Sequence, residues 1–88
     1  MTYLIKIPHT KEECLRALDE ELAKGTDVLN KVYFGCMAGD HTGYAIVDVS
    51  SESDARRLVP DFLLGKSSIT EVGKFTPDMI RSLHKKVA

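Results

Sequence analysis

The chain has 88 residues, 43% hydrophobic and 28% charged, proportions that predict one globular α+β domain spanning residues 1–88. A formal net charge of −1 offers no basic footprint for nucleic acid, and no hydrophobic run approaches the roughly 20 residues that span a membrane. Two cysteines, neither in a CxxC pair, together with the lack of a recognisable export signal predict reduced thiols in the cytoplasm.

The first half of the chain predicts a strand followed by a helix. Hydrophobic side chains recur at every second position over residues 2–8, a pattern that is typical of a strand. Pro8 should end this strand. Thr10 and Glu13 have the spacing of a capping box, so a helix is expected from there. Its hydrophobic stripe should comprise Cys14, Leu15, Leu18 and Leu22, with Gly25 as its C-terminal cap.

The middle of the chain predicts a β-hairpin. Residues 31–38 and 43–49 alternate in the manner of strands, and the Gly-containing segment 39–43 between them has the composition of a turn.

The last part predicts two further helices with a strand between them. Ser50 and Ser51 should cap a helix that stops or kinks at Pro60. Residues 67–75 predict a fourth strand, and Thr76 followed by proline starts a final helix. The hydrophobic stripe of that helix should consist of Met79, Ile80, Leu83 and Val87.

The resulting order is β-α-β-β-α-β with an extra C-terminal helix, which is the ferredoxin-like plan. We expect a four-stranded antiparallel sheet in the order 4-1-3-2, with two helices covering one face.

The uncovered face of this sheet should be largely hydrophobic, carrying Leu4, Tyr33, Met37, Tyr44 and Ile46 with Lys6 and Asp48 among them. Three arrangements would explain it: a homodimer formed through this face, stacking of RNA bases, or cover by the C-terminal helix. Lys6 and Tyr44 are candidate ligand-binding side chains on it.

An RNA-binding role has one partial match. Gly43, Tyr44 and Ala45 fit the RNP1 pattern of RNA-recognition motifs. The basic position is Thr42 and the final aromatic position is Val49, so the chain offers little stacking or phosphate binding. The pattern therefore argues against nucleic acid as a partner.

Side chains that bind metals gather at one predicted edge of the sheet. Because the first two strands should run parallel, the end of the first strand, the start of the first helix and the hairpin turn lie together there, bringing His9, Cys14, Cys36, Asp40 and His41 to that edge. Imidazole and thiolate suit nickel, zinc or copper, and we predict His9, Cys36, Asp40 and His41 as ligands. Alternatively, both cysteines are small core residues and Asp40 only supports the turn.

Over most of its length the chain resembles small members of the dimeric α+β-barrel superfamily, which include a ferredoxin-like nickel-binding family. The resemblance is carried by YLIKIP, KVYFGCMAGDHTGYAIVDVSSESDARRLV and SSITEVGKF. It implies a homodimer with a ligand pocket, in a superfamily that includes isomerases and cofactor-free monooxygenases. The alternative to a metal- or ligand-binding protein is thus a small-molecule enzyme in which His9 or His41 acts as general base.

Overall fold

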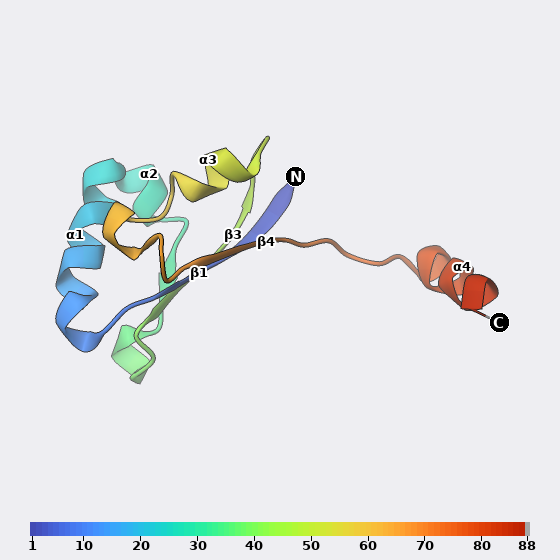
Figure 1. Ribbon diagram of the computed structural model, residues 1–88, viewed down its shortest axis with the longest axis horizontal. Coiled ribbons are helices and arrows are strands. Elements are labelled where there is room, and N and C mark those ends of the chain that lie inside the picture. Colours follow the sequence, from blue (N-terminus) through green and yellow to red (C-terminus); the bar gives the residue numbers. More distant parts are fainter. Residues whose placement is uncertain (88) are drawn as a thin grey trace.

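The computed structural model describes residues 1–87, and the side chains of residues 1–86 (Figure 1). Its elements in chain order are β1 (Thr2–Pro8), the 3-10 turn η1 (Lys11–Glu13), α1 (Cys14–Lys24), α2 (Thr26–Leu29), β2 (Tyr33–Phe34), η2 (Cys36–Ala38), β3 (Thr42–Asp48), α3 (Glu52–Arg56), η3 (Asp61–Leu63), β4 (Ser68–Glu71) and α4 (Pro77–Val87).

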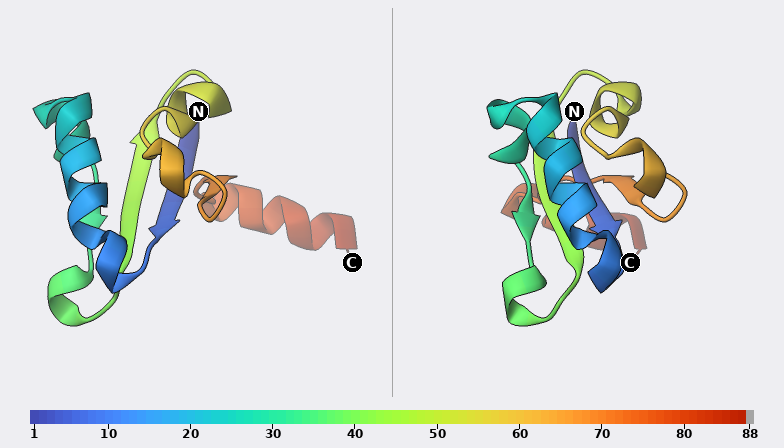
Figure 2. Two further views of the ribbon diagram at one scale, coloured as in Figure 1. Left: turned by 60° about the vertical axis from the view of Figure 1, so that its left-hand side comes forward. Right: turned by 90° about the vertical axis from the view of Figure 1, so that its left-hand side faces the viewer.

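The four strands form one antiparallel sheet in the order β2-β3-β1-β4. Read from its other edge, this is the predicted order 4-1-3-2, and the ferredoxin-like α+β fold expected from the sequence is confirmed. Both β1 and β2 run antiparallel to β3, so they are parallel to each other. The helices α1 and α3 lie on the same face of the sheet (Figure 2).

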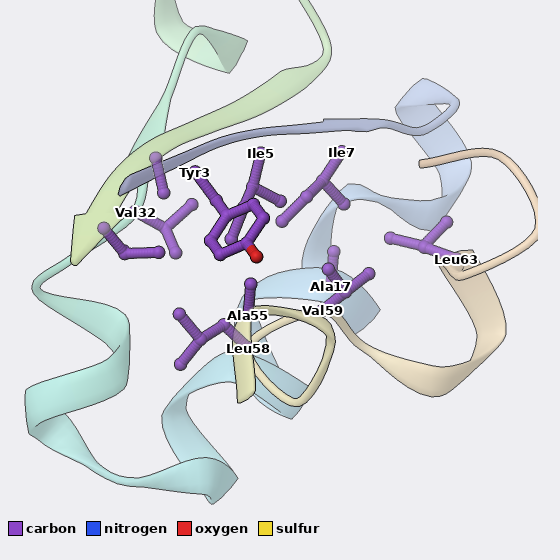
Figure 3. Packing of buried hydrophobic residues seen from close by; sticks show 11 residues of the cluster. Tyr3, Ile5, Ile7, Ala17, Val32, Ala55, Leu58, Val59 and Leu63 are labelled. Carbon is purple, nitrogen blue, oxygen red and sulfur yellow. The ribbon is translucent and has the colours of Figure 1, made fainter. Parts of the chain in front are cut away.

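The core lies between the sheet and these helices. Tyr3, Ile5 and Ile7 point from β1 toward the helical layer, as their predicted alternation requires (Figure 3). The buried cluster also contains Ala17, Val32, Ala45, Val47, Ala55, Leu58, Val59 and Leu63.

The second strand is much shorter than predicted. Instead of residues 31–38, only Tyr33 and Phe34 pair with β3, and the chain then turns into η2. The cause is local: the carbonyl of Gly35 accepts hydrogen bonds from the amides of Ala38 and Asp40, which curls the chain away from the sheet. Met37, predicted on the open face, is consequently fully exposed in this loop.

The inward face of α1 also differs from the prediction. Leu15 and Leu22 are 69% and 54% exposed, whereas Ala17 and Glu21 are fully buried. Cys14 and Leu18 are half-buried as predicted, so the helix is turned by less than one residue, or 100°, from the expected orientation. The inward face of the helix thus carries a small side chain at Ala17 and, one turn later, a glutamate.

One face of the sheet is left uncovered. Its hydrophobic side chains come from three adjacent strands and will be called the open sheet face: Leu4, Tyr33, Tyr44 and Ile46. Tyr33 and Ile46 are 77% and 69% exposed.

The C-terminal part leaves the body of the molecule. β4 ends at Glu71 rather than Phe75, and α4 begins after an extended segment (Figure 1). Thr76 caps α4 as predicted, its hydroxyl accepting a hydrogen bond from the Met79 amide at 3.2 Å. The predicted contribution of Val87 to the stripe falls on a side chain outside the described part of the structure. Over residues 1–87, no helix has both the length and the hydrophobicity to cross a membrane.

Candidate metal centre

Four metal-binding side chains meet where β1 ends beside the β2–β3 connection. His9, Cys14, Cys36 and His41 each contribute one donor atom, and all four atoms lie within 4.8 Å of one another. His9 is buried and the other three are half-buried. Three separate segments of the chain supply this cluster, which we call the Cys2His2 cluster.

His9 is held in one orientation by the end of β1. Its backbone amide donates to the carbonyl of His41 at 3.0 Å, which extends the β1–β3 pairing by one step and places the two imidazoles side by side. The ring Nδ1 lies 3.1 Å from the carbonyl oxygen of Ile7. Because a carbonyl can only accept, the neutral ring carries its proton on Nδ1 and keeps the Nε2 lone pair free. A histidine so oriented is prepared to bind a metal through Nε2.

The free Nε2 of His9 faces the thiols. It lies 3.3 Å from the sulfur of Cys36, and the thiol of Cys14 donates to that same sulfur at 3.1 Å. Both cysteines are free thiols. Burial raises the pKa of Cys36 to about 11, and its pairing with the neighbouring Cys14 thiol adds to this rise. Without a metal, the Cys36 thiol therefore keeps its proton at neutral pH and lies between the Cys14 sulfur and the His9 imidazole.

Cys14 is placed by the start of the first helix. The capping box predicted from the sequence is present, since the Glu13 amide donates to the Thr10 hydroxyl and the Thr10 amide to the Glu13 carboxylate. A hydrogen bond from Lys66, followed by one from Thr10, lowers the pKa of Glu13 to about 2, so this carboxylate stays charged. Cys14 follows directly as the first residue of α1 and faces the cluster.

The loop of residues 35–42 positions Cys36 and His41. A Cβ atom on Gly35 would lie 2.7 Å from the carbonyl oxygen of Asp40, so only glycine allows the two ends of this loop to approach. Gly39 has a φ of +89°, a conformation that glycine adopts without strain. Both glycines thus support a tight loop that returns His41 to the end of β1.

His41 has a polar atom that lacks a partner. Its Nδ1 is buried and makes no hydrogen bond within the described part of the chain. Such an atom normally costs about 1–3 kcal/mol, and a bound ion is one way to satisfy it.

Three of the four predicted ligands come together in this cluster, whereas Asp40 points elsewhere. Its carboxylate accepts a hydrogen bond from the Tyr44 hydroxyl at 2.5 Å, and this bond, with one from Thr42, lowers the pKa of Asp40. The cluster instead includes Cys14, which the sequence places at the same edge but also on a hydrophobic helix stripe.

The two predicted ligand-binding side chains lie on the open sheet face. Lys6 and Tyr44 are direct cross-strand neighbours in the β1–β3 register. Tyr44 lines a groove of about 380 Å³ there, together with Leu4, Tyr33, Ala45 and Ile46. Neither histidine of the Cys2His2 cluster lines this groove.

The cluster has the composition and size of a tetrahedral site. A zinc ion with two sulfurs at about 2.3 Å and two nitrogens at about 2.0–2.1 Å places its ligand atoms about 3.3–3.8 Å apart. The sulfur–sulfur and sulfur–nitrogen distances of 3.1 and 3.3 Å are close to that range, and the four donor atoms together spread over no more than 4.8 Å. Small side-chain movements would therefore suffice to enclose an ion.

Comparison with known proteins assigns the chain to no family: it matches no protein-family model, no curated protein and no solved structure.

Proposed function

We propose that this protein binds one transition-metal ion, and that the ligands are His9, Cys14, Cys36 and His41. The convergence of these four donor atoms within 4.8 Å is the observation that carries the proposal. Two sulfur and two nitrogen ligands are typical of tetrahedral Zn²⁺ sites. Zinc is therefore favoured over nickel and copper, which the sequence also allows.

The ligand set indicates a structural rather than a catalytic role for the metal. Four protein ligands complete a tetrahedral shell and leave no position for substrate, as in structural zinc sites. The ion would join the start of α1 and the end of β1 to the loop of residues 35–42. Because no residue of this loop belongs to the buried core, the metal fixes the loop rather than creating the fold.

The histidine-based enzyme is less well supported. A general base needs a substrate pocket within hydrogen-bonding reach. His9 Nε2 faces the sulfur of Cys36, and its Nδ1 is engaged with a backbone carbonyl. Cytoplasmic location and membership of the dimeric α+β-barrel superfamily remain proposals that are compatible with free thiols and with the confirmed fold.

Metal analysis of the tag-free protein tests the proposal. Chain dialysed against Zn²⁺ and then against buffer should retain about one ion per chain, as measured by plasma mass spectrometry. His41→Ala and Cys36→Ser should each weaken zinc binding by more than about tenfold, because ligand loss costs at least as much as loss of a supporting hydrogen bond.

Two matched controls separate this site from adventitious binding. Asp40→Asn should retain zinc, because the Asp40 carboxylate is bound to Tyr44 instead. His84→Ala removes an exposed histidine of α4 and should also retain it. Equal zinc content in the wild type and the two ligand variants, with circular dichroism confirming folded protein, would refute the site.

A further inference from the structure

Two hydrophobic surfaces of this chain are uncovered, one on the sheet and one on a helix. One is the open sheet face. The other consists of three residues of α4 and one residue just before the helix, each about half-exposed or more, and we call it the α4 stripe: Phe75, Met79, Ile80 and Leu83. The spacing of Met79, Ile80 and Leu83 places them on one side of the helix, and Phe75 lines a groove together with Met79 and Leu83. Exposed hydrophobic patches of this kind commonly mark an interface.

The segment before α4 carries the helix away from its own sheet. The Val72 amide donates to the Thr2 carbonyl at 2.9 Å, so the chain continues along β1 and past its first residue. Residues 73–76 then extend further, and α4 lies clear of the body (Figure 1). The radius of gyration is 16.1 Å, whereas a compact chain of this length has about 12 Å.

We propose that α4 is exchanged between two copies of this chain, each helix packing its stripe on the open sheet face of the other copy. The exchange is reciprocal, so one two-fold axis relates two identical contacts and covers both pairs of exposed surfaces.

The dimensions of the two surfaces agree. An eleven-residue helix is about 16 Å long, and the four strands of the sheet span about 14 Å from first to last. The sheet is hollowed along this path by two grooves of about 380 Å³ each, which share Leu4 and Ile46. The second groove reaches Val72 and Lys74, where the extended segment leaves the sheet.

The buried area would suffice for a stable dimer. The exposed parts of the four stripe residues and of the four open-face residues amount to roughly 800 Å² per contact. Two reciprocal contacts would therefore bury about 1,600 Å², which is the size of a standard stable interface.

The charges are complementary as well. Residues 1–73 carry eight basic and twelve acidic side chains, a net charge of −4. Residues 74–88 carry four basic and one acidic side chain, a net charge of +3. Attraction between the C-terminal segment of one copy and the body of the other favours this pairing over a sheet-to-sheet contact between two acidic bodies.

Light scattering coupled to size-exclusion chromatography tests the exchange in the full chain. The wild type should have twice the chain mass of 9.8 kDa. Leu83→Glu in the α4 stripe and Ile46→Glu on the open sheet face should each halve that mass. The matched control Leu22→Glu replaces a leucine of similar exposure in α1 and should leave the dimer intact.

Other results would overturn the exchange in distinguishable ways. A wild type that is monomeric at about 0.5 mM would mean that α4 covers its own sheet or stays free. A dimer broken by Ile46→Glu but untouched by Leu83→Glu would mean that two sheets pack directly on each other. Circular dichroism of each variant establishes that the loss of mass is not caused by unfolding.

Discussion

The carboxylate of Glu21 is the least favourably placed polar group in the body of the molecule. The residue is 0% exposed on the inner side of α1, and neither carboxylate oxygen has a hydrogen-bond partner among residues 1–86. Burial raises its pKa to about 7; Lys24 opposes this rise and Glu20 adds to it. At neutral pH this side chain is therefore poised between its neutral and its charged form.

This pKa makes folding stability depend on pH in a defined direction. Between pH 4.5 and about 7 the unfolded chain releases the Glu21 proton while the folded chain keeps it, so stability falls as the pH rises. The total loss is on the order of 3 kcal/mol and is complete above the folded-state pKa. We expect the Glu21→Gln variant to lack this fall in stability and to be more stable than the wild type at pH 8.

Urea unfolding at pH 5 and pH 8 with a chelator present measures the effect. Glu12→Gln, which neutralises an exposed carboxylate, serves as the control and should keep the pH dependence of the wild type. If Glu21→Gln shows the wild-type difference between the two pH values, the buried carboxylate is not its source.

Among the elements, the start of α1 connects stability with the candidate metal centre. The Thr10 side chain caps η1, the turn that leads directly into α1, and Cys14 is the first residue of α1. Thr10→Ala should lower the free energy of unfolding by about 1 kcal/mol, the usual cost of losing an N-cap. It should also weaken zinc binding, because the position of Cys14 depends on this turn.

Thr26→Ala is the matched control for the cap. This exposed threonine begins α2, whose N-cap makes no side-chain hydrogen bond. Its replacement should change stability and zinc binding little. Equal effects of the two substitutions in urea unfolding and zinc titration would show that the capping box has no special role.

The strands at the centre of the sheet could be predicted because their neighbours constrain them on both sides. β1 and β3 alternate over seven residues each, and one face of both packs on the helices, so the pattern in the sequence reflects their burial. The edge strand β2 has a partner on one side only. There the loop geometry imposed by Gly35 outweighs the alternation that continues to residue 38.

The orientation of α1 could not be predicted from hydrophobicity. Two stripes with the same helical spacing lie one residue apart, and the leucine-rich stripe is the more hydrophobic. The stripe that faces inward contains Cys14, Ala17 and Glu21. The burial of Ala17 and the contact of Cys14 with Cys36 go with this choice, and both depend on distant parts of the chain.

At the scale of the whole molecule, topology explains how the candidate site forms. Residues 9, 14, 36 and 41 have no common motif in the sequence, and the parallel arrangement of β1 and β2 alone brings their segments to one edge. That much could be predicted. The choice of Cys14 over Asp40 could not, because it depends on the helix rotation and on the hydrogen bond between Asp40 and Tyr44.

The exchange of α4 involves a different set of residues from the metal ligands. The residues that would form the contact lie on the open sheet face and beyond β4, and none of them belongs to the Cys2His2 cluster. Zinc binding should therefore persist in the monomeric Leu83→Glu variant, and the dimer should persist in Cys36→Ser.

X-ray absorption spectroscopy at the zinc edge tests the central claim most directly. The tag-free protein loaded with one equivalent of Zn²⁺ should show two sulfur ligands at about 2.3 Å and two imidazole nitrogens at about 2.0–2.1 Å. The Cys14→Ser variant should show a single sulfur. A first shell of nitrogen and oxygen alone in the wild type, or two sulfurs retained in Cys14→Ser, would contradict the Cys2His2 assignment.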